Sequence, residues 1–94
     1  MKMFQLHIGS NSPDGSISPE TQLSIQAAVA KEFPSFSILK GQGFFRGKAE
    51  DLLIVKIATD QEPAVFQLAS TLRAALAQEG IGIEHDGRYT RVTR

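Results

Sequence analysis

The sequence contains no cysteine, and this absence removes several kinds of chemistry from consideration. A chain without cysteine forms no disulfide, has no thiolate nucleophile and offers no thiolate ligand to zinc. Charge of one sign is also lacking, because 10 Lys and Arg residues balance 10 Asp and Glu residues. Balanced charge supplies no overall field that would draw the chain onto nucleic acid or an anionic membrane, so any electropositive site must be local.

Long apolar runs are absent as well. No run reaches the roughly 18 residues that a membrane helix needs, and residues 1–5 lack the apolar segment of a signal peptide. We therefore expect a cytoplasmic protein without a membrane partner. The length of 94 residues, with 41% apolar and 21% charged residues, fits a single globular domain over residues 1–94.

The first third of the chain has the pattern of a strand followed by a helix. Residues 3–8 alternate apolar with mostly polar side chains, which predicts a strand with one buried face. Residues 9–16 consist mainly of residues that favour turns, so a polar loop follows. Ser18 and Pro19 predict the start of a helix, which should end near Phe33 because a proline comes next.

The middle of the chain predicts two more strands. Residues 36–39 form the first, which Gly41 and Gly43 interrupt before it resumes at residues 44–45. We expect a bulge or a tight bend near the two glycines. Residues 52–58 are the strongest strand signal, and their continuous apolar start predicts a central position in the sheet.

The last third predicts a helix and a closing hairpin. Asp60 is a suitable N-cap, and apolar residues recur at helical spacing over residues 65–76. Gly80 suits a left-handed stop at the end of this helix. Asp86 and Gly87 form a two-residue turn signal between two short apolar segments, so the chain should finish as a strand or a hairpin.

This order of elements is that of an α+β fold, the ferredoxin-like βαββαβ sandwich, with an antiparallel sheet, two helices on one face and either a strand or a hairpin at the C-terminus. The other face of the sheet is left uncovered and is too apolar to be fully hydrated. We therefore expect a homo-oligomer, a dimer or larger, formed through the sheet or its edges. The expected open-face residues are Met3, Gln5, His7, Leu52, Ile54 and Lys56.

Residues 41–51 have the most distinctive chemistry in the chain, because they combine glycines, aromatic rings, bases and acids. An aromatic face can stack on a planar ring while a nearby base binds an anionic group, so we expect a small anionic, aromatic or nucleotide-like ligand. The competing interpretation is a bent hairpin whose charges only keep it hydrated. The candidate ligand-binding residues are Phe44, Phe45, Arg46, Lys48, Glu50 and His7, and no catalytic residue, metal ligand or cofactor is assigned.

Three known motifs do not fit this segment. A phosphate-binding P-loop fails because Gly41 precedes Gly47 by one residue too many and a strand follows. The dinucleotide fingerprint fails because no helix N-terminus follows to receive the pyrophosphate. The string from Gly41 to Arg46 resembles the acylphosphatase signature Gln-Gly-Val-x-Phe-Arg. That family has its arginine between the first strand and the first helix, whereas Arg46 lies after the first helix, so we interpret the match as coincidental.

A broader resemblance is to small uncharacterised bacterial and phage proteins, in which an aromatic glycine segment, a Glu and an apolar strand precede a second helix ending near Gln-Glu. This resemblance implies the same sandwich and an accessory protein of a phage or prophage. Some phage proteins of this size sequester nucleotide signals, which implies a nucleotide-like ligand. The matching residues are Gly41, Gly43, Phe44, Phe45, Gly47, Glu50 and Gln78.

The sequence favours a non-enzymatic module that binds a small ligand or a protein partner. The alternative is an enzyme that performs acid–base chemistry on a small molecule, using His7 with Glu50 or Arg46 in a pocket completed by oligomer contacts. RNA binding is a third interpretation and the least favoured, because the central strands lack the exposed aromatics that an RNA-recognition module needs. Its basis is the basic C-terminus formed by Arg88, Tyr89, Arg91 and Arg94.

Metal binding has little support in the sequence. Glu84, His85 and Asp86 are metal-capable but adjacent, and adjacent strand residues point to opposite faces of the sheet. No metal site is therefore predicted.

Overall fold

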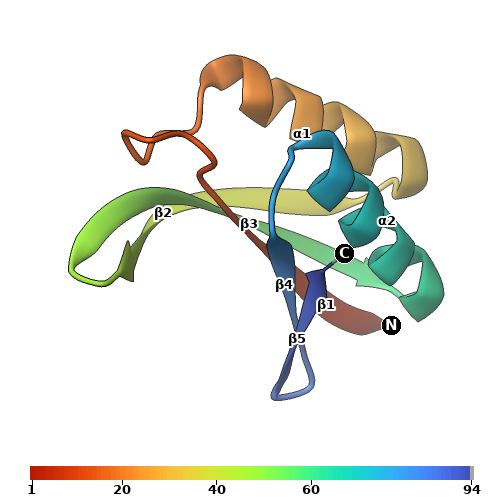
Figure 1. Cartoon of the computed structure of the whole chain (residues 1–94). Helices are drawn as coiled ribbons and strands as arrows, with labels where there is room; N and C mark the ends of the chain where they lie inside the picture. Colours follow the sequence, from red (N-terminus) through yellow and green to blue (C-terminus); the bar gives the residue numbers. More distant parts are fainter. Residues whose placement is uncertain (94) are drawn as a thin grey trace.

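A computed structural model describes residues 1–93, which form two helices and one five-stranded sheet (Figure 1). All neighbouring strands are antiparallel, and their order is β2-β3-β1-β4-β5. The predicted ferredoxin-like sandwich with a C-terminal hairpin is confirmed. The elements are β1 (Lys2–Gly9), α1 (Pro19–Glu32), β2 (Phe36–Phe45), β3 (Lys48–Thr59), α2 (Glu62–Ala75), β4 (Gly80–His85) and β5 (Arg88–Thr93).

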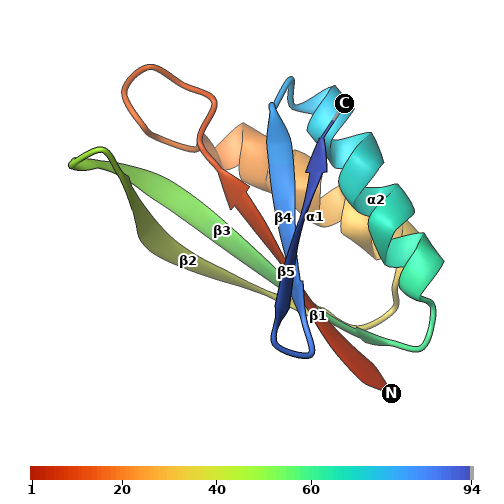
Figure 2. The same cartoon turned by 60° about the horizontal axis from the view of Figure 1, so that its bottom comes forward.

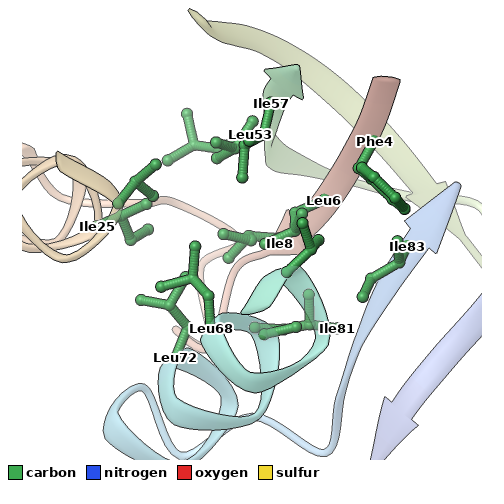
Figure 3. Close-up of a cluster of buried hydrophobic side chains, with 14 of the residues drawn as sticks. Phe4, Leu6, Ile8, Ile25, Leu53, Ile57, Leu68, Leu72, Ile81 and Ile83 are labelled. Carbon is green, nitrogen blue, oxygen red and sulfur yellow. The ribbon is translucent and has the colours of Figure 1, made fainter. Parts of the chain in front are cut away.

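Both helices cover the same face of the sheet, as Figures 1 and 2 show from two directions. The core lies between this face and the helices, and Figure 3 shows its side chains converging from β1, β3, β4, α1 and α2. Because side chains alternate across a strand, the residues between the buried ones face the open side of the sheet. The buried strand residues are Phe4, Leu6, Ile8, Leu53, Val55, Ile57, Ile81 and Ile83.

The start of α1 agrees with the sequence, but the ends of α2 do not. The Ser18 hydroxyl accepts a hydrogen bond from the Thr21 N–H, and Pro19 is the first helical residue. The expected Asp60 cap is wrong: Gln61 is the N-cap, and the Asp60 carboxylate lies 3.6 Å from the N-terminal amine. The expected stop at Gly80 is also wrong, because Ala77 adopts the left-handed conformation with φ 54° soon after the helix ends.

The hairpin of β2 and β3 forms a long arm that extends past the helices (Figure 1). The expected bulge at Gly41 and Gly43 is wrong, because β2 pairs with β3 in one unbroken register from Phe36 to Phe45. Neither glycine has a positive φ, and β3 is 12 residues long, so each β2 position keeps a partner. The bend falls instead on the two-residue turn at Arg46 and Gly47, whose φ values are 51° and 77°.

The C-terminal hairpin is confirmed. Asp86 and Gly87 form its turn with φ values of 53° and 75°, as a two-residue hairpin turn requires. The turn sets the register of β4 against β5, in which Gly82 pairs with Arg91 and Glu84 pairs with Tyr89. Neither helix within residues 1–93 is long and apolar enough to cross a membrane.

Candidate ligand groove on the open sheet face

The open face of the sheet has glycines at neighbouring positions of β1 and β4. Because glycine has no side chain, the surface is concave at these positions. On β4, burial of Ile81 and Ile83 against the helices leaves Gly80 and Gly82 on the open side. Gly9 at the end of β1 lies beside them. The resulting hollow has a volume of about 530 Å³, and we call it the open-face groove; its lining includes His7, Gly9, Glu50, Gly82, Tyr89 and Arg91.

One wall of the open-face groove comes from β5. Its Tyr89 and Arg91 side chains lie diagonally across Gly82 and Gly80, in place of the side chains that those positions lack. A Cβ atom at Gly82 would overlap the Tyr89 phenol, and one at Gly80 would lie 2.6 Å from the Arg91 Nε. The glycines are therefore required for this wall, because any larger residue would displace it.

His7 lies next to this wall on β1, where it pairs with Gly82. Its ring meets the Tyr89 ring edge-on at a centroid distance of 5.8 Å. Its Nε2 atom lies 3.4 Å from the Glu84 Oε1, an ion-pair distance when the imidazole is protonated. That contact lacks hydrogen-bond geometry, and Nε2 is buried with no hydrogen-bond partner in the described part of the chain.

The opposite wall comes from the β2–β3 arm. Phe45 and Glu50 line the groove, and the Glu50 Oε1 lies so close to Gly9 that a Cβ there would be 3.3 Å away. Phe44 and Phe45 are 73% and 66% exposed, which is unusual for phenylalanine. The Arg46 guanidinium carbon lies 5.2 Å from the Phe45 ring centroid, a cation–π contact at the tip of the arm.

One end of the groove is closed by the segment between α2 and β4. The Gln78 side-chain amide donates a 2.7 Å hydrogen bond to the Gly9 carbonyl, and Arg73 Nη1 donates to the Gln78 carbonyl at 3.1 Å. The Asn11 amide donates to the carbonyls of Leu76 and Ala77 at the end of α2. These bonds fix the end of β1 against α2 and hold the groove floor in place.

The loop over residues 10–18 lies beside the β2–β3 arm in both views (Figures 1 and 2). The Asp14 carboxylate accepts hydrogen bonds from the hydroxyls of Ser16 and Ser12 and from the Ser16 N–H, and these bonds lower its pKa to about 2. The Asp51 carboxylate accepts from the Ile17 N–H at 2.9 Å. The loop is thus tied to β3 and supports the Glu50 side of the groove.

The open-face groove brings together four of the six residues predicted from the sequence: His7, Phe44, Phe45 and Glu50. Arg46 and Lys48 do not line it. Arg46 lies in the turn of the arm, and the Lys48 ammonium donates a hydrogen bond to the Pro13 carbonyl at 3.2 Å. Within residues 1–93, no group of three or more acidic and histidine side chains is placed to hold a metal ion.

Sequence reasoning missed the β5 wall and the closed end. The sequence places Tyr89 and Arg91 only in the basic C-terminus on which the RNA-binding interpretation rests, and Gln78 only in a resemblance. The signal for the wall was present, since a two-residue turn at Asp86 and Gly87 dictates which residues oppose the β4 glycines. Arg94, the last member of the predicted basic C-terminus, lies outside the described residues.

Comparisons with known proteins give structural neighbours of one kind. The fold matches a phage SAM lyase in its apo state, with a TM-score of 0.66, and a phage SAM lyase in complex with S-methyl-5'-thioadenosine, with a TM-score of 0.68. In both cases identity is 17%, and the match covers 99% of this chain and 89% of the other. No protein-family model and no curated protein matches the sequence.

These neighbours correct one expectation and support part of another. The expected non-enzymatic binding module is contradicted, because both neighbours are an enzyme, and the small-molecule enzyme that stood as the alternative agrees better with them. The neighbours are phage proteins, which agrees with the phage part of the resemblance seen in the sequence. The expected oligomer stays a prediction.

Proposed function

We propose that this chain is an enzyme that cleaves S-adenosylmethionine, or a closely related sulfonium nucleoside, in the open-face groove. The observation that carries the proposal is the groove of about 530 Å³ on a fold shared with a lyase solved with S-methyl-5'-thioadenosine. Ligand pockets usually measure about 300–1,000 Å³, so the hollow suits a ligand of nucleoside size.

The lining of the groove has the chemistry that such a ligand needs. The exposed rings of Phe45 and Tyr89 stand on opposite walls, where either can stack on a purine base. The Glu50 carboxylate beside Gly9 is a hydrogen-bond acceptor for the two ribose hydroxyls. The carboxylates of Glu50 and Glu79 also attract a cationic substrate, and aromatic faces stabilise a sulfonium as they do other cations.

The proposed reaction breaks the bond between the sulfonium sulfur and the γ-carbon of the amino-acid part. An oxygen of the substrate's own carboxylate forms the new bond to that carbon, and the electron pair of the broken bond goes to sulfur. The products are a five-membered lactone that keeps its ammonium group and the neutral thioether S-methyl-5'-thioadenosine, so atoms and charge balance without water. Because internal attack in the right geometry has effective molarities of about 10⁵–10⁸ M, the chain's task is orientation.

The groove is open on one side, and we propose that a second copy of the chain covers it. The rings of Phe44 and Phe45 at the end of the arm are exposed apolar groups of the kind that mark contact sites. In an oligomer, Arg46 and Lys48 near the tip of the arm would lie at the contact with the neighbouring copy, which is the role we propose for these two residues. The exposed Met3 and Leu39 side chains on the open face of the sheet support the same assembly.

The test is to incubate the purified protein with S-adenosylmethionine and follow S-methyl-5'-thioadenosine and homoserine lactone by mass spectrometry. The wild type should form both products in equal amounts. Glu50→Gln, which removes the carboxylate from the groove, should reduce the rate by about 10²-fold or more. Glu32→Gln is the matched control, because Glu32 is an exposed carboxylate at the end of α1, on the other face of the sheet.

Two results would overturn the proposal. The first is a wild type that neither forms S-methyl-5'-thioadenosine nor binds it in calorimetry. The second is equal activity of the wild type and the Glu50→Gln variant, which would place the reaction outside the open-face groove.

A further inference from the structure

Arg91 differs from the other basic side chains because it lies in the open-face groove, flat against the floor. A Cβ atom at Gly80 would lie 2.6, 2.9 and 3.0 Å from the Nε, Cζ and Cγ atoms of Arg91. The whole side chain, from stem to guanidinium, therefore covers Gly80. Because Gly80 has no side chain, the Arg91 side chain can lie directly against the β4 backbone, and this contact fixes its position.

The guanidinium of Arg91 has no carboxylate partner and no hydrogen bond among residues 1–93. Arginine carries five N–H donors in a planar fork with a permanent positive charge, which favours contact with a carboxylate oxygen. The other charged residues of the groove lining are Glu50 and Glu79, so Arg91 is the one lysine or arginine of the lining in the described chain.

We propose that Arg91 binds the carboxylate of the amino-acid part of the substrate, and that Gly80 holds Arg91 in place for this contact. The inference rests on the proposed function and deepens it. One carboxylate oxygen held by the guanidinium leaves the other free to attack the γ-carbon, so Arg91 is a positioning residue for the reaction. Arg91 is also a specificity residue, because the product S-methyl-5'-thioadenosine has no carboxylate and therefore gains no affinity from the guanidinium.

The experiment compares a ligand that has the carboxylate with one that lacks it. The value of kcat/KM for S-adenosylmethionine and the Kd for S-methyl-5'-thioadenosine are measured for the wild type, Arg91→Gln and Arg91→Lys. Gln and Lys keep a stem that covers Gly80, so the wall stays in place. Arg88→Gln is the matched control: it removes the same charge from the same strand, at a position on the opposite face of the sheet.

Arg91→Gln should lower kcat/KM by about 10- to 100-fold, the size expected for losing hydrogen bonds between charged groups. Its Kd for S-methyl-5'-thioadenosine should stay within about twofold of the wild type, because that ligand does not reach Arg91. Arg91→Lys should recover part of the loss, since it keeps the charge without the fork. Arg88→Gln should change neither value.

The outcomes separate this inference from the proposed function. An active wild type with an Arg91→Gln variant of unchanged kcat/KM overturns the role of Arg91 and leaves the function standing. Equal losses of kcat/KM and of affinity for S-methyl-5'-thioadenosine also overturn it, because Arg91 would then only support the wall. A wild type that neither cleaves S-adenosylmethionine nor binds S-methyl-5'-thioadenosine overturns both.

Discussion

Two glycines on the open face of the sheet should respond differently to the same substitution. Glycine in a strand is less stable than alanine by about 0.5–1 kcal/mol because it loses more conformational freedom on folding. A Cβ at Gly41 meets nothing within 4 Å, so Gly41→Ala should raise the free energy of unfolding by about that amount. A Cβ at Gly82 would occupy the place of the Tyr89 phenol and force the ring away.

The displaced ring loses its edge contact with His7, and aromatic pairs of this kind are worth about 0.5–1.5 kcal/mol. We therefore expect the free energy of unfolding of Gly82→Ala to be lower than that of Gly41→Ala by about 0.5–1.5 kcal/mol, as measured by urea denaturation. Gly82→Ala should also weaken binding of S-methyl-5'-thioadenosine, and Gly41→Ala should not. If both variants gain stability equally and bind equally, Tyr89 does not lie on Gly82 in solution.

Three further predictions concern the core, the loop and the arm. Leu6→Ala should lower the free energy of unfolding, measured by urea denaturation, by about 2–5 kcal/mol, because Leu6 is fully buried. A loss below about 1 kcal/mol would contradict the burial of Leu6 in the core. Asp14 has a pKa of about 2 in the folded chain against an ordinary 3.8, so its contribution to stability should be present above pH 3.8 and lost as the pH falls through about 2. Its carboxyl NMR titration should have a midpoint near 2, and a midpoint near 3.8 would refute the hydrogen bonds. Phe44→Ser should lower the mass of the protein in light scattering towards that of a monomer. Leu23→Ser is the control, because Leu23 is also exposed but lies on α1, and it should leave the mass unchanged. Equal masses for the wild type and both variants would refute an oligomer contact at Phe44.

The sandwich was predictable because its signals are local. The alternation of Phe4, Leu6 and Ile8 identifies the buried face of β1, and the face that remains contains His7. The loop residues and Ser18 correctly separate β1 from α1. Each of these signals depends on neighbouring residues in the chain, which is why no structure was needed to interpret them.

The errors have a different origin, since each depends on contacts between distant segments. Gly41 and Gly43 look like interruptions in β2, yet pairing with the long β3 keeps them in the strand. Asp60 looks like a helix cap, but the chain enters α2 through Gln61 and leaves the Asp60 carboxylate near the N-terminus. Neither outcome follows from the residues on either side.

The site was predictable in part. The aromatic and acidic residues of the arm pointed to Phe45 and Glu50, which line the groove, whereas the predicted Arg46 lies in the turn of the arm outside it. The proposed enzyme class was not predicted from the sequence because the proposed bond cleavage uses the substrate's own carboxylate. Such a reaction needs no nucleophile or metal motif in the protein, so motif searching had nothing to find.

The most direct test of the account is an NMR titration of the 15N-labelled protein with S-methyl-5'-thioadenosine. Saturable shifts are expected at the amides of Gly9, Gly82 and Tyr89 in the open-face groove, with the amides on the exposed side of α1 unchanged. The absence of any amide shift at millimolar ligand, or shifts that map to the helical side of the sheet, would contradict binding in the groove.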